Sequence, residues 1–98
     1  MAEAHVVHCR REPYDVYIGR ASFRRGHRLV ASKWANPFRE GRDGDRGEVV
    51  AKYEDWLRSQ PALIVALPEL RGKVLGCWCA PKPCHGDVLV RLANGDTA

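Results

Sequence analysis

The chain has no long hydrophobic run. Its longest uninterrupted apolar stretch, Ala62 to Leu67, is far below the ~18 residues that a membrane span requires. The N-terminal residues, MAEAHVVHC, contain no signal-peptide core. These two absences predict a cytoplasmic protein without a membrane partner.

The chain also has no internal repeat and no room for a second core. At 98 residues it is long enough for one hydrophobic core and too short for two, so residues 1–98 are expected to form a single domain. With 45% hydrophobic and 29% charged residues, its composition is that of a globular protein, which excludes a wholly disordered chain.

Acidic residues are scarce in one part of the chain. From Arg10 to Arg46 there are ten Lys or Arg against five Asp or Glu, whereas the remainder carries six basic and seven acidic residues. A localised positive excess suits an anionic partner such as a nucleotide or a nucleic acid. The alternative is a basic surface that only keeps the protein soluble.

Disulfides are not expected, although the chain has four cysteines. In a reducing compartment, cysteines are free, metal-bound or reactive more often than paired. Cys77 and Cys79 would stand roughly 6.5 to 7 Å apart at Cα on an extended strand, which is at or beyond the usual limit for a disulfide.

Short apolar and β-branched segments, separated by turn signals, predict the strands. The last of them has no polar alternation, which is typical of a central strand covered on both faces. The segment 21–38 shows little periodicity and predicts a loop-rich lobe with one short strand. The expected strands are Ala4 to Arg10, Asp15 to Arg20, Leu29 to Ala31 and Val74 to Cys79.

Helix signals are strong in the second half. Asp45 can cap a helix and Glu48 completes an acidic capping box, which predicts a helix from Arg46 to Arg58. A short helix, Ala62 to Leu67, and a final helix, Cys84 to Ala93, follow. The order of elements predicts a small three-layer α/β sandwich with a mostly parallel sheet of about three or four strands.

The motif C-x-C-x4-C-H places Cys77, Cys79, Cys84 and His85 close together in sequence. Thiolates and imidazole are the preferred ligands of zinc, so the four residues are one candidate zinc site, with Cys9 as a further donor. A regular strand holds Cys77 and Cys79 too far apart to chelate without distortion, and adjacent residues at a helix start, such as Cys84 and His85, diverge by roughly 100° around the axis. The alternative is that Cys77 and Cys79 are small buried hydrophobes.

Cys84 differs from the other cysteines because it falls at a predicted helix N-terminus. Unpaired N–H groups there stabilise anions, which favours a low thiol pKa and an anion site over Cys84, His85, Gly86 and Asp87. His85 is a candidate acid, base or orienting group. Asp87 can cap the helix or hold a ligand hydroxyl group.

A second group of candidate ligand-binding residues lies in the basic half. Gly19 allows close backbone approach, and Arg20, at a strand end, can clamp a phosphate or carboxylate in a bidentate manner. Asn36 stands in a turn between Trp34 and Phe38, which offer either a stacking surface for a base or core packing.

Five stretches together carry a resemblance: DVYIGR (15–20), ANPF (35–38), YEDWL (53–57), LRGKVLGCWCAPKPCHGDVL (70–89) and the trailing LAN. In order and spacing, the chain resembles the domain-of-unknown-function family 4326, small proteins of bacteria and their phages. The resemblance supplies no reaction. It implies that the family's motif positions are Gly19, Arg20, Asn36, Pro37, Cys77, Cys79, Cys84, His85 and Asp87.

Motif residues that lie far apart in sequence make most sense if they converge on one pocket. We therefore expect a small nucleotide- or nucleic-acid-processing enzyme, in which Cys84 is nucleophile or ligand, His85 is acid, base or orienter, and Asp87 assists. The alternative is a non-catalytic module, zinc-stabilised or not, that binds nucleic acid or protein. A third interpretation treats the Cys-His turn as purely structural.

Overall fold

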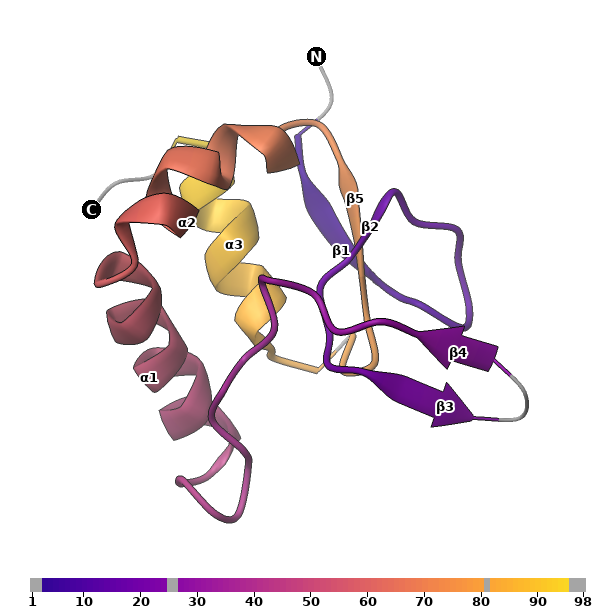
Figure 1. Cartoon of the computed structure of the whole chain (residues 1–98), viewed down its shortest axis with the longest axis horizontal. Coiled ribbons are helices and arrows are strands. Elements are labelled where there is room, and N and C mark those ends of the chain that lie inside the picture. Colours follow the sequence, from indigo (N-terminus) through magenta and orange to yellow (C-terminus); the bar gives the residue numbers. More distant parts are fainter. Residues whose placement is uncertain (1–2, 25–26, 81, 96–98) are drawn as a thin grey trace.

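The computed structural model of the chain describes residues 3–24, 27–80 and 82–95. Within this part of the chain, four strands come first, two helices and a 3-10 turn follow, and a fifth strand and a last helix end the chain (Figure 1). The elements are β1 (His5–His8), β2 (Val16–Tyr17), β3 (Ser22–Arg24), β4 (His27–Leu29), α1 (Arg46–Arg58), α2 (Pro61–Ala66), the 3-10 turn η1 (Leu67–Leu70), β5 (Val74–Cys77) and α3 (His85–Ala93).

The main sheet is parallel and has three strands in the order β1-β5-β2. His5 pairs with Val74 on one side of β5, and Val16 pairs with Leu75 on the other. Pairing continues past the strand ends, where Ile18 N donates to a β5 carbonyl at 3.0 Å. The α/β class, the parallel sheet and the central place of the apolar strand are all confirmed.

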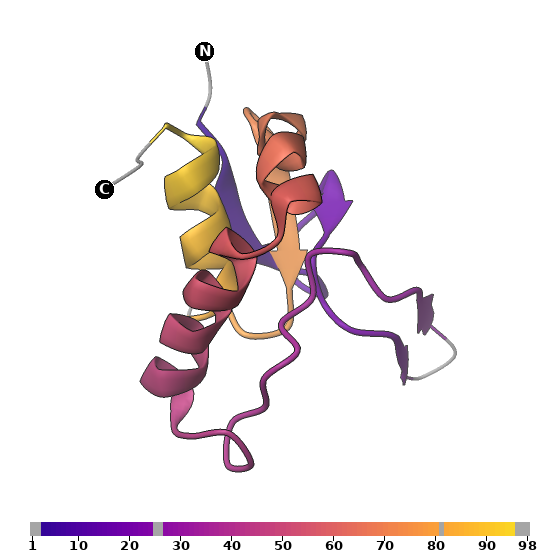
Figure 2. The same ribbon diagram turned by 60° about the vertical axis from the view of Figure 1, so that its left-hand side comes forward.

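The helices gather on one side of this sheet, as both views show (Figures 1 and 2). α3 packs on β1 and on η1, and α1 packs on α3. Leu75 from the sheet and Leu89 from α3 are fully buried in this core. On the other side the cover is aromatic, because the Tyr14 ring lies over Gly76 so closely that a Cβ there would stand 2.6 Å from its Cγ.

The helix α1 has the predicted bounds and the predicted cap. Asp45 Oδ1 accepts from Glu48 N at 2.8 Å, and Glu48 Oε1 accepts from Asp45 N at 3.0 Å. Val49, Tyr53 and Leu57, spaced four residues apart, form its buried face. This helix therefore begins where its side chains satisfy the first free N–H groups.

The helix predicted at Ala62 to Leu67 is α2, which begins at Pro61 and passes directly into η1. Gly72 then turns the chain into β5 with a φ of 72°, a left-handed backbone conformation that glycine adopts without steric cost. No helix of the described residues is long and apolar enough to cross a membrane.

The basic lobe differs from the prediction. In place of one strand at Leu29 to Ala31, β3 and β4 form an antiparallel hairpin in which Phe23 pairs with Arg28. The sequence pattern did not reveal this hairpin, because β3 and β4 are only three residues long each and lack an apolar face. Trp34 is core, since it is 2% exposed and its carbonyl accepts from Tyr53 Oη at 2.7 Å.

Candidate functional site

The carboxyl ends of the parallel strands meet at one edge of the sheet, where α3 begins. A cavity of about 400 Å³ opens there. Ligand sites of open α/β sheets usually lie at this edge. Its wall combines aromatic side chains (Tyr17, Phe38 and Trp78), cations (Arg20, Arg39 and Arg46), and thiols with an imidazole (Cys77, Cys79, Cys84 and His85), together with Gly19 and Asn36.

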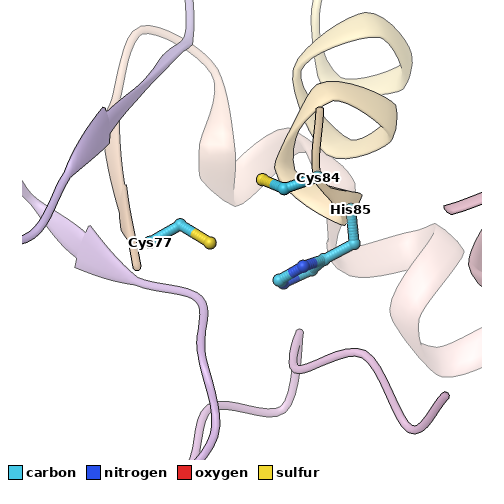
Figure 3. A group of neighbouring side chains, drawn as sticks. All are labelled: Cys77, Cys84 and His85. Atoms are coloured by element: carbon cyan, nitrogen blue, oxygen red, sulfur yellow. The ribbon is translucent and has the colours of Figure 1, made fainter. Parts of the chain in front are cut away.

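Three thiols and one imidazole form the inner end of the cavity. Cys77 from the end of β5 and Cys84 and His85 from the start of α3 point toward one another (Figure 3). Their ligand atoms all lie within 4.8 Å of one another. The thiols of Cys77, Cys79 and Cys84 are also hydrogen-bonded to one another, and all three cysteines are free.

The prediction that Cys77 and Cys79, and likewise Cys84 and His85, point apart is therefore wrong, for two reasons. The strand ends at Cys77, so Cys79 is not on a regular strand and its N–H turns back to Cys77 Sγ at 3.5 Å. Cys84 is the N-cap of α3 with extended backbone, φ −152° and ψ 171°, and not a helical residue. The 100° rotation between helical neighbours does not apply to Cys84 and His85.

Hydrogen bonds set the acidity of the thiols. The pKa of Cys79 is lowered because Cys77 and Cys84 hydrogen-bond to its sulfur and the Arg46 guanidinium donates to it. The pKa of Cys77 is raised to about 11, chiefly by its bond to Cys79. The pKa of Cys84 is raised by its bonds to Cys77 and Cys79. The low pKa expected of Cys84 is thus reversed, although Gly86 N does donate to its sulfur at 3.2 Å.

His85 is buried and neutral. Its Nε2 lies 2.7 Å from the carbonyl oxygen of Ile18, which can only accept, so Nε2 carries the proton and Nδ1 keeps its lone pair. Burial lowers the pKa of the imidazole. The ring also meets the Tyr53 ring edge-on at 4.9 Å between centroids, which fixes its orientation.

This group of side chains fits a metal ion of the zinc type. Cys77, Cys84 and His85 are donors that zinc prefers, and Cys79 offers a fourth thiol beside them. A metal-bound histidine usually donates its other ring N–H to a carbonyl or a carboxylate. The bond from His85 to Ile18 supplies that arrangement.

Arg20 lies at the cavity wall and also braces it. Its Nε donates to the carbonyl of Asn36 at 3.1 Å, and its Nη2 donates to the carbonyl of Phe38 at 2.7 Å. Arg46, on the first turn of α1, donates from Nη1 to the carbonyl of Pro83 at 3.0 Å. The two arginines thus hold separate loops in place, and the Arg46 guanidinium also pairs with Glu40, an acidic residue of the same cavity wall, at 3.3 Å.

Asn36 and Gly19 line the cavity as predicted, but their observed contacts are internal. Asn36 Nδ2 donates to the carbonyl of Val49 at 3.2 Å, and its Oδ1 accepts from Phe38 N at 2.9 Å. A Cβ on Gly19 would collide with the Tyr17 ring, which folds back over that position. Both residues shape the wall, and a ligand contact by either one stays a prediction.

Gly86 and Asp87 are not brought to the cavity wall with the other predicted residues. A Cβ on Gly86 would lie 2.8 Å from side-chain atoms of Val6 and Ile18, so this glycine lets α3 approach the sheet. Asp87 is exposed, and its Oδ2 accepts from Cys84 N at 3.0 Å, which completes a capping box. The observed contact of Asp87 is thus the cap of α3.

Sequence reasoning offered Phe38 as an aromatic contact, and Phe38 does line the cavity, but it missed Tyr17, Trp78 and Arg46. Tyr17 and Trp78 stand at the ends of β2 and β5 and are joined by a 3.0 Å bond from Trp78 Nε1 to Tyr17 Oη. Their places directly at the carboxyl ends of two parallel strands were the available signal. Arg46 carried no such signal, since it reaches the cavity only through the packing of α1 on α3.

Comparison with known proteins gives a family. A family model described as "Domain of unknown function (DUF4326)" matches residues 3–95. The chain is 40% identical over 86 residues to the uncharacterized protein R718 of Acanthamoeba polyphaga mimivirus, covering 80% of this chain and 65% of that protein. It is 34% identical over 94 residues to an uncharacterized 12.4 kDa protein of the nrdA-td intergenic region of Enterobacteria phage T4, covering 91% and 76%. No solved structure gives a significant match.

Proposed function

The chain belongs to the DUF4326 family, and on that premise we propose that it is a nucleotide- or nucleic-acid-processing enzyme whose active site is the cavity at the carboxyl end of the sheet. Its phosphate-bearing ligand lies against the arginines, and the Cys–His group forms the reactive end. One observation carries this proposal: cationic, aromatic and nucleophilic side chains line the same cavity of about 400 Å³.

The size and lining of the cavity support a nucleotide-sized ligand. Small-molecule sites commonly have volumes of about 300 to 1,000 Å³. Guanidinium groups recognise phosphate oxygens, and aromatic faces stack on bases. Arg39, which lines the cavity from the loop before α1, and Trp78, which lines it from the end of β5, offer these two kinds of contact.

The reactive end combines nucleophilic and proton-accepting groups. Cys84 and Cys79 offer sulfur, and the neutral His85 ring offers Nδ1 as a lone pair, because its Nε2 is held by the Ile18 carbonyl. Their mutual contacts keep these groups ordered inside the protein, as a reaction site requires. Asp87 contributes by capping the helix that carries Cys84.

A second candidate concerns the cofactor. We propose that Cys77, Cys84 and His85 hold a zinc ion with Cys79 beside them, because their donor atoms lie within 4.8 Å of one another. When bound, zinc supplies either folding energy or a Lewis acid for the cavity. If all four residues bind it, the role is structural; if Cys79 does not, one position stays open to the cavity.

Metal analysis tests the zinc proposal. Protein purified without chelator should carry about one zinc per chain, and Cys84→Ser should lower that ratio severalfold. Cys9→Ser is the matched control. The sequence offered Cys9 as a further donor, but among the described residues the close donor group is Cys77, Cys84 and His85, and Cys9 is a partly buried cysteine outside the cavity wall. Metal-free wild-type protein, or equal loss in both variants, would overturn the zinc assignment.

Titration with nucleotides tests the ligand. Nucleoside mono-, di- and triphosphates should raise Tm and bind measurably by calorimetry, and Arg39→Gln should weaken that binding about tenfold, as loss of a charge-assisted contact does. Arg42→Gln is the control, because Arg42 lies on the same loop, pairs with Asp43 at 2.7 Å and is not part of the wall. Absence of binding, or equal effects of both variants, would refute the proposed site.

A further inference from the structure

The hairpin formed by β3 and β4 projects away from the helices (Figures 1 and 2). Ala21 and Ser22, at the start of this hairpin, line the cavity. Residues 20–33 contain five Lys or Arg and no Asp or Glu. This stretch lies within the longest run of the chain without an acidic residue, 16–39, and it starts at Arg20, which lines the cavity. The hairpin is therefore an acid-free, cationic extension of the candidate site.

The hairpin also exposes a large aromatic side chain. Phe23 is 72% exposed, and across the hairpin it pairs with Arg28, which is exposed as well. Val30, directly after β4, is 77% exposed. An exposed aromatic residue among arginines is the combination by which proteins hold unpaired nucleic acid, with bases stacked on rings and phosphates on cations.

The hairpin and the cavity are continuous. A second hollow is lined by Ala21, Ser22, Phe23, Arg28 and Leu29, and two of these residues, Ala21 and Ser22, also line the main cavity. A ligand that passes from one hollow to the other would leave a single nucleotide in the cavity and place its neighbours over Phe23 and Arg28.

From this continuity, and resting on the proposed function, we infer that the ligand of the cavity is a nucleotide within a single-stranded nucleic acid whose flanking chain lies along the β3–β4 hairpin. The strand must be unpaired, because the faces of a base inside a duplex are covered by the base pairs stacked above and below it, whereas a base of a single strand can turn its face to the Phe23 ring. A protein partner fits less well, since the acid-free hairpin would need a strongly acidic partner with its own apolar contact for Phe23.

Fluorescence anisotropy with labelled oligonucleotides tests this inference. A single-stranded DNA or RNA 12-mer should bind at least tenfold more tightly than a mononucleotide. Its affinity should fall steeply with salt, since each phosphate contact contributes about 0.7 to the slope of log K against log salt. A duplex of the same sequence should bind about tenfold less tightly.

Variants locate the effect on the hairpin. Phe23→Ser should weaken oligonucleotide binding about tenfold without changing mononucleotide binding, as loss of one stacked base does. Arg28→Gln should lower the salt slope by about 0.7. Val65→Ser is the matched control for an exposed apolar residue, since Val65 is 80% exposed on α2, and it should change neither measurement.

The outcomes separate this inference from the proposed function. If mononucleotides bind but the 12-mer binds no more tightly, or Phe23→Ser has no effect, the hairpin inference is overturned and the cavity proposal stands. If neither ligand binds, both are overturned. If the duplex binds as tightly as the single strand, the single-strand claim is overturned. If no oligonucleotide binds, and the wild-type protein forms a dimer that Phe23→Ser abolishes, the hairpin binds a second copy of the chain instead.

Discussion

Replacing Asn36 by Ala should destabilise the protein strongly, because Asn36 ties the loop after Trp34 to α1. Its Nδ2 donates to the carbonyl of Val49, and its Oδ1 accepts from Phe38 N. Alanine removes both bonds and leaves two backbone groups without these partners. The side chain is only 8% exposed, so water replaces them poorly.

The magnitude follows from these two bonds. Loss of each hydrogen bond costs about 0.5 to 1.5 kcal/mol net, and Phe38 N, a partly buried donor left without this acceptor, adds about 1 kcal/mol, the low end of the cost for a buried donor. The sum for Asn36→Ala is about 2 to 4 kcal/mol. At about 4 to 8 °C per kcal/mol for a domain of this size, Tm should fall by at least about 8 °C.

Thermal and urea unfolding monitored by circular dichroism measure this change. Asn94→Ala is the matched control, because the Asn94 side chain also makes two backbone bonds, to N and O of Ala4 at 3.0 and 3.3 Å, but is exposed. It should cost only about 1 kcal/mol. Equal stability of the two variants would refute the reasoning from burial. Wild-type stability of Asn36→Ala with loss of nucleotide binding would instead make Asn36 a ligand contact.

Three further changes test the fold. Asp45→Ala removes the cap of α1 and should lower stability by about 1 kcal/mol in urea unfolding. Gly76→Ala pushes a methyl group into the Tyr14 ring and should cost about 1 to 3 kcal/mol by the same assay; unchanged stability would show that the ring moves freely. Hydrogen bonding from Arg58 lowers the pKa of the Glu54 carboxyl group below its usual value of 4.5. The ionised carboxylate therefore stabilises the folded protein at pH values above 4.5, and this stabilisation is lost as the pH falls through the lowered pKa. Glu54→Gln should therefore cost about 0.5 to 1 kcal/mol at pH 7 and nothing near pH 2, which a pH series of melting curves checks.

Local patterns were enough to predict most of the fold. The capping box at Asp45 located the start of α1, and the apolar run from Val74 identified the central strand, because both signals act within a few residues. The β3–β4 hairpin was not predictable in this way. Its strands gain no stability from an apolar face, and Phe23 points to solvent, so no periodicity marks them.

The candidate site was predicted in composition but not in geometry. Arg20, Cys84 and His85 do converge on one cavity, as the strand-end rule implies. The contact of Cys79 with Cys77 and Cys84 could not be derived, because it depends on the chain leaving the strand at Cys77. A low pKa of Cys84 was predicted from the helix terminus alone, whereas in the structure the neighbouring thiols of Cys77 and Cys79 raise that pKa.

The position of β5 at the centre of the sheet has a consequence for how the protein forms. Both of its neighbours, β1 and β2, come from the start of the chain. Even β2, the nearer of the two in sequence, is far from β5: Val74 N donates to the side chain of Asp15, just before β2, across 59 positions. During synthesis β1 and β2 must wait, without sheet partners, until β5 has left the ribosome. Such long loop closures slow folding. The sheet therefore closes late, and α1, with a cap made of its own neighbouring residues, is the element best able to form first.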